Sequence, residues 1–130
     1  MATKNKHTAE LVKLAADVPA LIDGLEGKIA DVAGRMAALK KAGLIYATEH
    51  WRKGSDGEPK YLYLLYPQQP NEPRRREYVG CEVERIEEAR AGIIRAVEYD
   101  KLAAQHSALA CRARRVADAL GDARRYLAGS

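Results

Sequence analysis

The sequence has no phenylalanine and little cysteine, histidine or proline, with two, three and five of these residues among 130. It also lacks a run of about 18 apolar residues, which a membrane-spanning helix would require. Its first residues contain neither the apolar segment nor the cleavage site of a secretory signal. From these absences we expect a cytoplasmic protein without a membrane partner.

Cysteine and histidine are too scattered to predict a disulfide or a metal site. Cys81 and Cys111 lie thirty residues apart. On one continuous helix this separation corresponds to about 45 Å, far beyond the reach of an intrachain disulfide. The histidines, His7, His50 and His106, are equally dispersed. We therefore expect two unpaired thiols, buried or half-buried, and no metal ion.

Signatures of catalysis are missing as well. There is no glycine-rich phosphate loop, no H-E-x-x-H pair and no nucleophile elbow. Paired carboxylates such as Glu87 and Glu88 belong to the charged face of a predicted helix, where they serve solubility. We expect a protein that is not an enzyme, with no cofactor and no small-molecule substrate.

What the chain does contain is typical of amphipathic helices. Hydrophobic residues make up 47% and charged residues 31%, with alanine and leucine prominent. This length and composition predict one domain, residues 1–130. The net charge of +4 permits a nucleic-acid partner without requiring one.

Residues 7–42 are predicted to form a helix that packs against another helix. Apolar residues alternate at spacings of four and three from Leu11 to Leu39, which is the pattern of a coiled-coil seam. Gly43 follows as a left-handed C-cap. Pro19 should either kink the helix or restart it, and the unbroken register of the seam favours a kink.

Residues 44–80 change to the pattern of a β-meander. Tyrosines and β-branched residues fill three short segments, for which we predict strands at about 44–53, 60–66 and 75–79. The Asp56-Gly57 pair predicts a hairpin turn between the first two strands.

Residues 81–128 are predicted to form one long helix. They contain no proline, and a second seam of alternating spacing runs from Leu102 to Leu127. Glutamates gather at its start and arginines at its end, which suits the helix dipole. His106 stands at a seam position, where a polar residue can fix the register.

Together these segments predict an α+β, mainly α fold: a long antiparallel helical hairpin with a three-stranded antiparallel β-meander inserted at its joined end. Two helices alone form a thin core, so we also predict a homodimer. The residues expected in the hairpin or dimer seam are Leu25, Ile29, Val32, Met36, Leu102, His106, Leu109, Val116 and Leu120.

The meander is the main candidate binding site. In the middle strand Tyr61 and Tyr63 face one way, and Leu62 and Leu64 face the other. The candidate contact residues are Arg52, Lys53, Lys60, Tyr61, Tyr63, Arg74, Arg75 and Arg76. Cations beside aromatic rings suit phosphates and bases. The alternative is a purely structural sheet whose arginines cover tyrosine rings. Residues 44–80 carry six positive and five negative charges, so the basic character is local.

An antiparallel hairpin would create a secondary basic end. It would bring Lys4 and Lys6 close to Arg124 and Arg125. These cations could contact phosphates or an acidic protein, or they could simply suit the C-terminal end of a helix dipole.

The stretch YLYLLYP…RRREYVGCEVERIEEARAGIIRAVEYDKL resembles small uncharacterised proteins of plasmids, phages and integrated elements. These proteins are similar in a Y-x-Y-L-x-Y strand, an R-x-Y-V/I-G strand and a long helix with R-x-x-E-Y-D-x-L, here Arg95 to Leu102. Three strands followed by a helix are also similar to the arm-site DNA-binding domains of tyrosine recombinases, whose sheet enters the major groove. The resemblance covers about residues 44–105 and implies a mobile-element context.

Three functions follow as hypotheses. The first is a non-enzymatic DNA-binding accessory protein that contacts double-stranded DNA through the meander. The alternatives are a protein-binding module, such as a phage or plasmid inhibitor of a host defence complex, and a coiled-coil scaffold.

Overall fold

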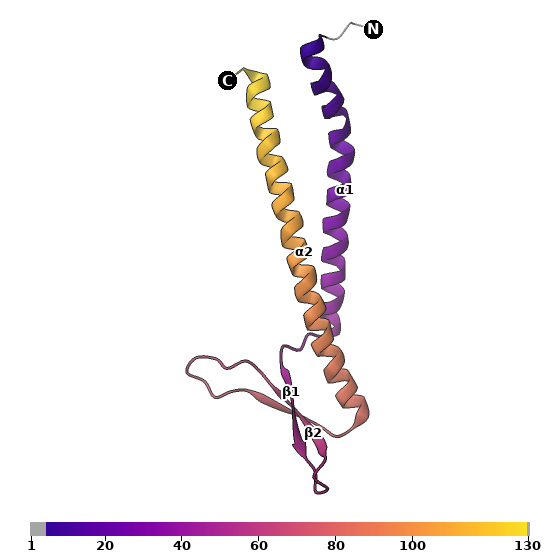
Figure 1. Ribbon diagram of the computed structural model, residues 1–130, viewed down its shortest axis with the longest axis vertical. Coiled ribbons are helices and arrows are strands. Elements are labelled where there is room, and N and C mark those ends of the chain that lie inside the picture. The colour runs from indigo at the N-terminus through magenta and orange to yellow at the C-terminus, as the bar shows by residue number, and fades with distance from the viewer. Residues whose placement is uncertain (1–4, 130) are drawn as a thin grey trace. The chain divides into compact units, whose positions relative to one another are not determined.

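The computed structural model describes residues 5–129 and confirms the predicted α+β, mainly α fold. Helix α1 spans Lys6–Ala42 and helix α2 spans Val83–Ala128, with strands β1 (Thr48–Lys53), β2 (Pro59–Leu65) and β3 (Arg76–Gly80) between them in sequence (Figure 1). None of the helices in the described part of the chain is long and apolar enough to cross a membrane.

The ends of α1 follow from local hydrogen bonding. At the start, the Asn5 side-chain oxygen accepts a hydrogen bond from the His7 amide at 2.8 Å, as an N-cap does. At the end, Gly43 has a φ of +112°, which confirms the predicted left-handed C-cap. The helix continues through Pro19, so the proline does not restart it.

Strand boundaries differ slightly from those predicted. β1 begins at Thr48 rather than at residue 44, because the Ile45 amide donates to the Gly92 carbonyl of α2 at 3.1 Å instead of pairing with β2. β3 covers Arg76–Gly80 rather than 75–79. The predicted turn at Asp56-Gly57 is present, with Gly57 at a φ of +82°.

Contacts group the chain into two compact units. One comprises the described residues up to Gly34 together with those from Ala103 onward, and the other comprises Arg35–Leu102. The first, which we call the helical unit, contains only segments of α1 and α2. The second, which we call the sheet unit, contains all three strands.

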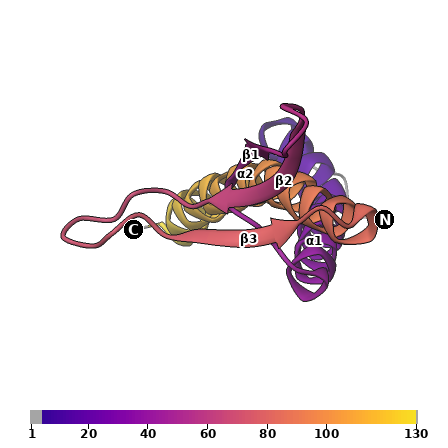
Figure 2. The same cartoon turned by 90° about the horizontal axis from the view of Figure 1, so that it is seen from below.

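In the sheet unit the strands form an antiparallel sheet of order β1-β2-β3 (Figure 2). Leu62 and Leu64 of β2 are fully buried and form a core cluster with Val79 and with Ala89 of α2. The face of the sheet that carries these leucines therefore packs on α2. A bulge beside Leu62 lets both Val79 and Gly80 be buried, with Gly80 at a φ of +104°.

In the helical unit the predicted seam is only partly covered. Val32 is the one buried residue among the described residues of this unit, and Leu25, Ile29, His106 and Leu109 are half-buried. Toward the chain ends α1 and α2 diverge (Figure 1), and seam residues there are exposed. Val116 and Leu120, both predicted in the seam, are also exposed. The remaining predicted seam residues, Met36 and Leu102, lie in the sheet unit, half-buried and buried respectively.

Candidate nucleic-acid interface

The face of the sheet that points away from the core is the candidate interface. Cross-strand pairing places His50 opposite Tyr63, Arg52 opposite Tyr61, and Tyr63 opposite Tyr78. Paired residues project to the same side of an antiparallel sheet. The outer face therefore comprises Thr48, His50, Arg52, Tyr61, Tyr63, Leu65, Arg76 and Tyr78.

Strand alternation places the carboxylates of the sheet on one side only. The two acidic residues within the strands, Glu49 and Glu77, both pair with Leu64 and so lie on the core side. Each already has a partner: Glu49 is 2.8 Å from the Arg90 guanidinium, and Glu77 accepts a hydrogen bond from the Tyr66 hydroxyl at 3.0 Å. The outer face carries two arginines and no carboxylate.

Aromatic rings on the outer face are close to one another and to cations. The rings of Tyr63 and Tyr78 are 5.0 Å apart between centroids and tilted by 56°. The Arg52 guanidinium lies 5.8 Å from the Tyr63 ring, and the Lys60 ammonium lies 5.6 Å from that of Tyr61. Tyr61, Tyr63, Arg52 and Lys60 thus come together as predicted candidates, whereas Lys53 follows a bulge at the end of β1.

The three consecutive arginines do not act as one group. The Arg74 Nε donates to the Tyr66 carbonyl at 3.0 Å, and the Arg75 guanidinium lies 4.4 Å from the Tyr66 ring. Arg76 pairs with Leu65 in the sheet, and its side chain, on the outer face, makes no hydrogen bond or ion pair with the described residues. Arg74 and Arg75 therefore stabilise the loop beside Tyr66, and Arg76 remains available to a partner.

Sequence reasoning missed Tyr78, which is 51% exposed and belongs to the outer face. The alternation in Arg76-Glu77-Tyr78 indicates that Arg76 and Tyr78 share one face of the strand. Only the pairing with β2 shows that this face is the outer one.

Tyr66, in contrast to Tyr78, is turned toward Glu77. Partial burial and this hydrogen bond raise its pKa above 10.0, so it stays a neutral donor.

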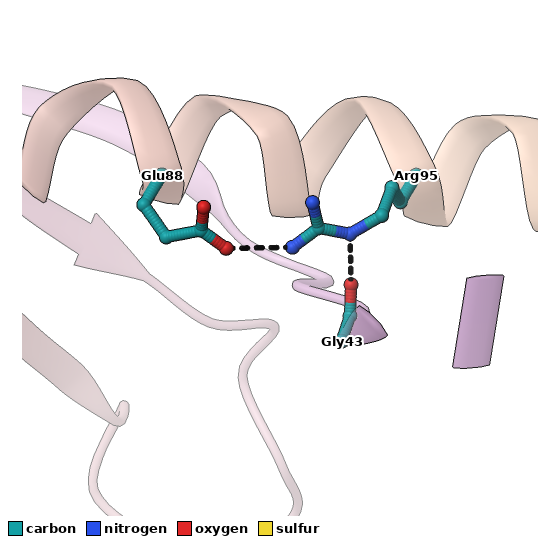
Figure 3. Close-up of polar contacts among 3 residues, drawn as sticks. All are labelled: Gly43, Glu88 and Arg95. Atoms are coloured by element: carbon teal, nitrogen blue, oxygen red, sulfur yellow. Dashed lines mark hydrogen bonds and ion pairs between the residues drawn. The ribbon is translucent and has the colours of Figure 1, made fainter. Parts of the chain in front are cut away.

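The run from Arg95 to Leu102 serves to hold the sheet unit together. Arg95 Nε donates to the Gly43 carbonyl at 2.7 Å, and its terminal nitrogen is 2.9 Å from Glu88 (Figure 3). Further along α2, Glu98 lies 3.7 Å from Arg35, and Leu102 is buried.

The structure describes three of the four residues predicted in the secondary basic end: Lys6, Arg124 and Arg125. Lys4 lies outside the described residues. Arg125 is ion-paired with Asp122 on the same helix. Lys6, Arg124 and Arg125 all have exposed side chains.

Groups for metal binding or disulfide chemistry do not converge either. Over the described range, no three His, Cys, Asp or Glu side chains gather as metal ligands would. The expectation of buried or half-buried thiols is wrong, because Cys81 and Cys111 are both exposed; neither forms a disulfide. Comparisons with family models, with curated proteins and with solved structures gave no match.

Proposed function

We propose that this protein binds double-stranded DNA, without catalysis, through the outer face of its sheet. One observation carries the proposal: the carboxylates of the strands lie on the core side, whereas Arg52 and Arg76 lie on the outer side among tyrosines. The near-zero net charge of residues 44–80 conceals this separation, because charge alone does not distinguish the two faces.

The chemistry of the face matches what DNA offers. Arginine donates forked hydrogen bonds to phosphate oxygens and to guanine edges. A two-stranded β-ribbon fits into the major groove, which is about 12 Å wide, and β2 with one of its neighbouring strands supplies such a ribbon. Tyrosine hydroxyls can add phosphate contacts that position the sheet. The resemblance to proteins of mobile elements supports an accessory role in such an element.

A protein-binding module is the second candidate. Tyrosine and arginine are also the residues that dominate protein interfaces, and Tyr78 is half exposed beside Tyr63. The two functions differ in their dependence on salt, because only DNA releases a condensed layer of counterions on binding.

The test is a fluorescence anisotropy titration of a labelled duplex at several salt concentrations. Each lost phosphate contact lowers the slope of log affinity against log salt by about 0.9. The double variant Arg52→Ala/Arg76→Ala should therefore bind more weakly and lose about 2 from the slope. The control is Arg74→Ala/Arg75→Ala, which removes the same charge beside Tyr66 and should retain most of the slope.

Circular dichroism and a melting curve verify that both double variants remain folded. Absence of duplex binding by the wild type at low salt would overturn the DNA proposal and favour the protein-binding module. Equal loss of binding in both double variants would show that the outer face is not the contact surface.

A further inference from the structure

An apolar groove crosses the helical unit. It has a volume of about 380 Å³ and is lined by Val18, Leu21, Ile22 and Leu25 of α1 and by Val116 of α2, with a few neighbours. Leu21 is 70% exposed, although it is one of the larger apolar side chains of the helix. The groove is therefore an unfilled apolar surface, in a unit that buries little of its own.

The apolar character continues along both helices on the side of the groove. Residues seven apart lie on nearly the same face of a helix. Leu14 precedes Leu21 by seven residues and is 58% exposed. On α2, Ala119 and Tyr126 follow the groove residue Arg112 by seven and fourteen. We call this combined surface the groove face.

Toward the chain ends, beyond Lys28 of α1, which also lines the groove, the two edges of the groove face have opposite charge. Glu10 and Asp17 precede Leu14 and Leu21 by four residues, so these carboxylates flank the apolar residues of α1. On α2 the flanking residues are the arginines Arg112 and Arg115.

None of these four charged side chains forms an ion pair with another residue between 5 and 129. Over the described helical unit, α1 has five carboxylates against three lysines, and α2 has five arginines against two aspartates. The four charged residues of the acidic and basic edges are thus without ion-pair partners among the residues that the structure describes.

We propose that the groove face binds a second copy of this chain. A two-fold interface is self-complementary, because each contact between one patch and another occurs twice. A surface with one acidic and one basic edge around an apolar centre meets this requirement, with α1 of one copy against α2 of the other. The resulting four-helix arrangement would cover Leu14 and Leu21, which a lone hairpin exposes.

Light scattering coupled to size exclusion tests this inference, because it gives the mass in solution. The wild type should show twice the 14.3 kDa of one chain, and Leu21→Glu should show the mass of a single chain at micromolar concentration. The matched control is Val12→Glu. Val12 is also exposed, at 44%, but lies on the opposite flank of the α1 seam, so this variant should remain dimeric.

A charge exchange provides an independent measurement. Arg112→Glu/Arg115→Glu should weaken association at least about tenfold, because carboxylates then face carboxylates. Adding Glu10→Lys/Asp17→Lys should restore the dimer by reversing both edges. A single-chain mass for the wild type, an equal effect of Val12→Glu and Leu21→Glu, or no restoration would each overturn the proposal.

Discussion

Gly92 is the position where a single added methyl group should disturb the sheet unit most directly. This residue is buried in α2, where Ile45 packs against it and donates its amide to the Gly92 carbonyl at 3.1 Å. A Cβ placed on Gly92 would lie 2.5 Å from Cδ1 and 2.7 Å from Cγ1 of Ile45. Carbon atoms pack best at about 3.5–4.0 Å, so the Ile45 side chain, the helix or the strand connection must move.

The expected effect of Gly92→Ala combines two opposing terms. Alanine favours the helix over glycine by about 1 kcal/mol, whereas overpacking typically destabilises by about 1–3 kcal/mol. The overlap involves two atoms of a β-branched side chain, which has little rotamer freedom. We therefore place the overpacking near its upper limit and expect a net loss of about 2 kcal/mol in the free energy of unfolding.

Urea unfolding followed by tryptophan fluorescence measures this effect in the relevant unit. Trp51 is the only tryptophan of the chain and packs against the same core cluster as Ile45. Gly121→Ala is the matched control on the same helix, because an added Cβ there meets nothing within 4 Å. This control should be neutral or stabilising by up to about 1 kcal/mol.

A double-mutant cycle with Ile45→Ala tests the proposed cause. Truncating Ile45 removes both close atoms and leaves only its Cβ, at 3.3 Å from the new methyl group. The two substitutions should therefore be less destabilising together than the sum of their separate effects, by about 1–2 kcal/mol. The reasoning is refuted if Gly92→Ala is as stable as the wild type, or if the two effects simply add.

Three further predictions concern single side chains of the sheet unit. Arg95→Met should lower the unfolding free energy by about 1.5–3 kcal/mol, because the Gly43 carbonyl loses a charged donor; an unchanged urea midpoint would contradict this. The hydrogen bond from Tyr46 to Asp100 raises the pKa of Tyr46 above 10.0. The stability that this hydrogen bond contributes is therefore present below pH 10 and is lost as the pH rises through the pKa of Tyr46 in the folded protein. The stability of Tyr46→Phe should then fall less steeply above pH 10.0 than that of the wild type. Urea midpoints that fall as steeply in the variant as in the wild type would argue against this reasoning. Gly57→Ala should destabilise the hairpin by about 1–2 kcal/mol, because Gly57 has a φ of +82° with open space around it; a higher melting temperature would refute the conformational argument.

Much of the fold could be predicted because helical periodicity and turn residues are local signals. The seam of α1 kept its register across Pro19, and Gly43 marked the end of the helix as expected. The start of β1 was predicted too early. Ile45 is a β-branched residue of the kind that favours strands. Its amide, however, donates a hydrogen bond to the carbonyl of Gly92, more than forty residues away, and no local sequence pattern indicates that contact.

The candidate site was predicted in composition but not in geometry. Three adjacent arginines look equivalent in the sequence, yet alternation and pairing place Arg76 outside while Arg74 and Arg75 bind Tyr66. The same alternation places Glu49 and Glu77 on the core side. Register with β2 decides all these positions, and register is a property of strand pairs rather than of any one segment.

The long-range pairs of the sheet unit also determine how this sequence can change over evolutionary time. Asp100 holds Tyr46, and Glu98 faces Arg35, so each partner stands more than fifty residues from its counterpart. A substitution at one position of such a pair is best tolerated when the other changes with it, which leaves correlated substitutions among descendants. The side chain of Arg76, which has no hydrogen-bond or ion-pair partner among the described residues, is free of that constraint. As copies of this protein diverge, the two members of each pair should therefore change together, whereas Arg76 should change independently.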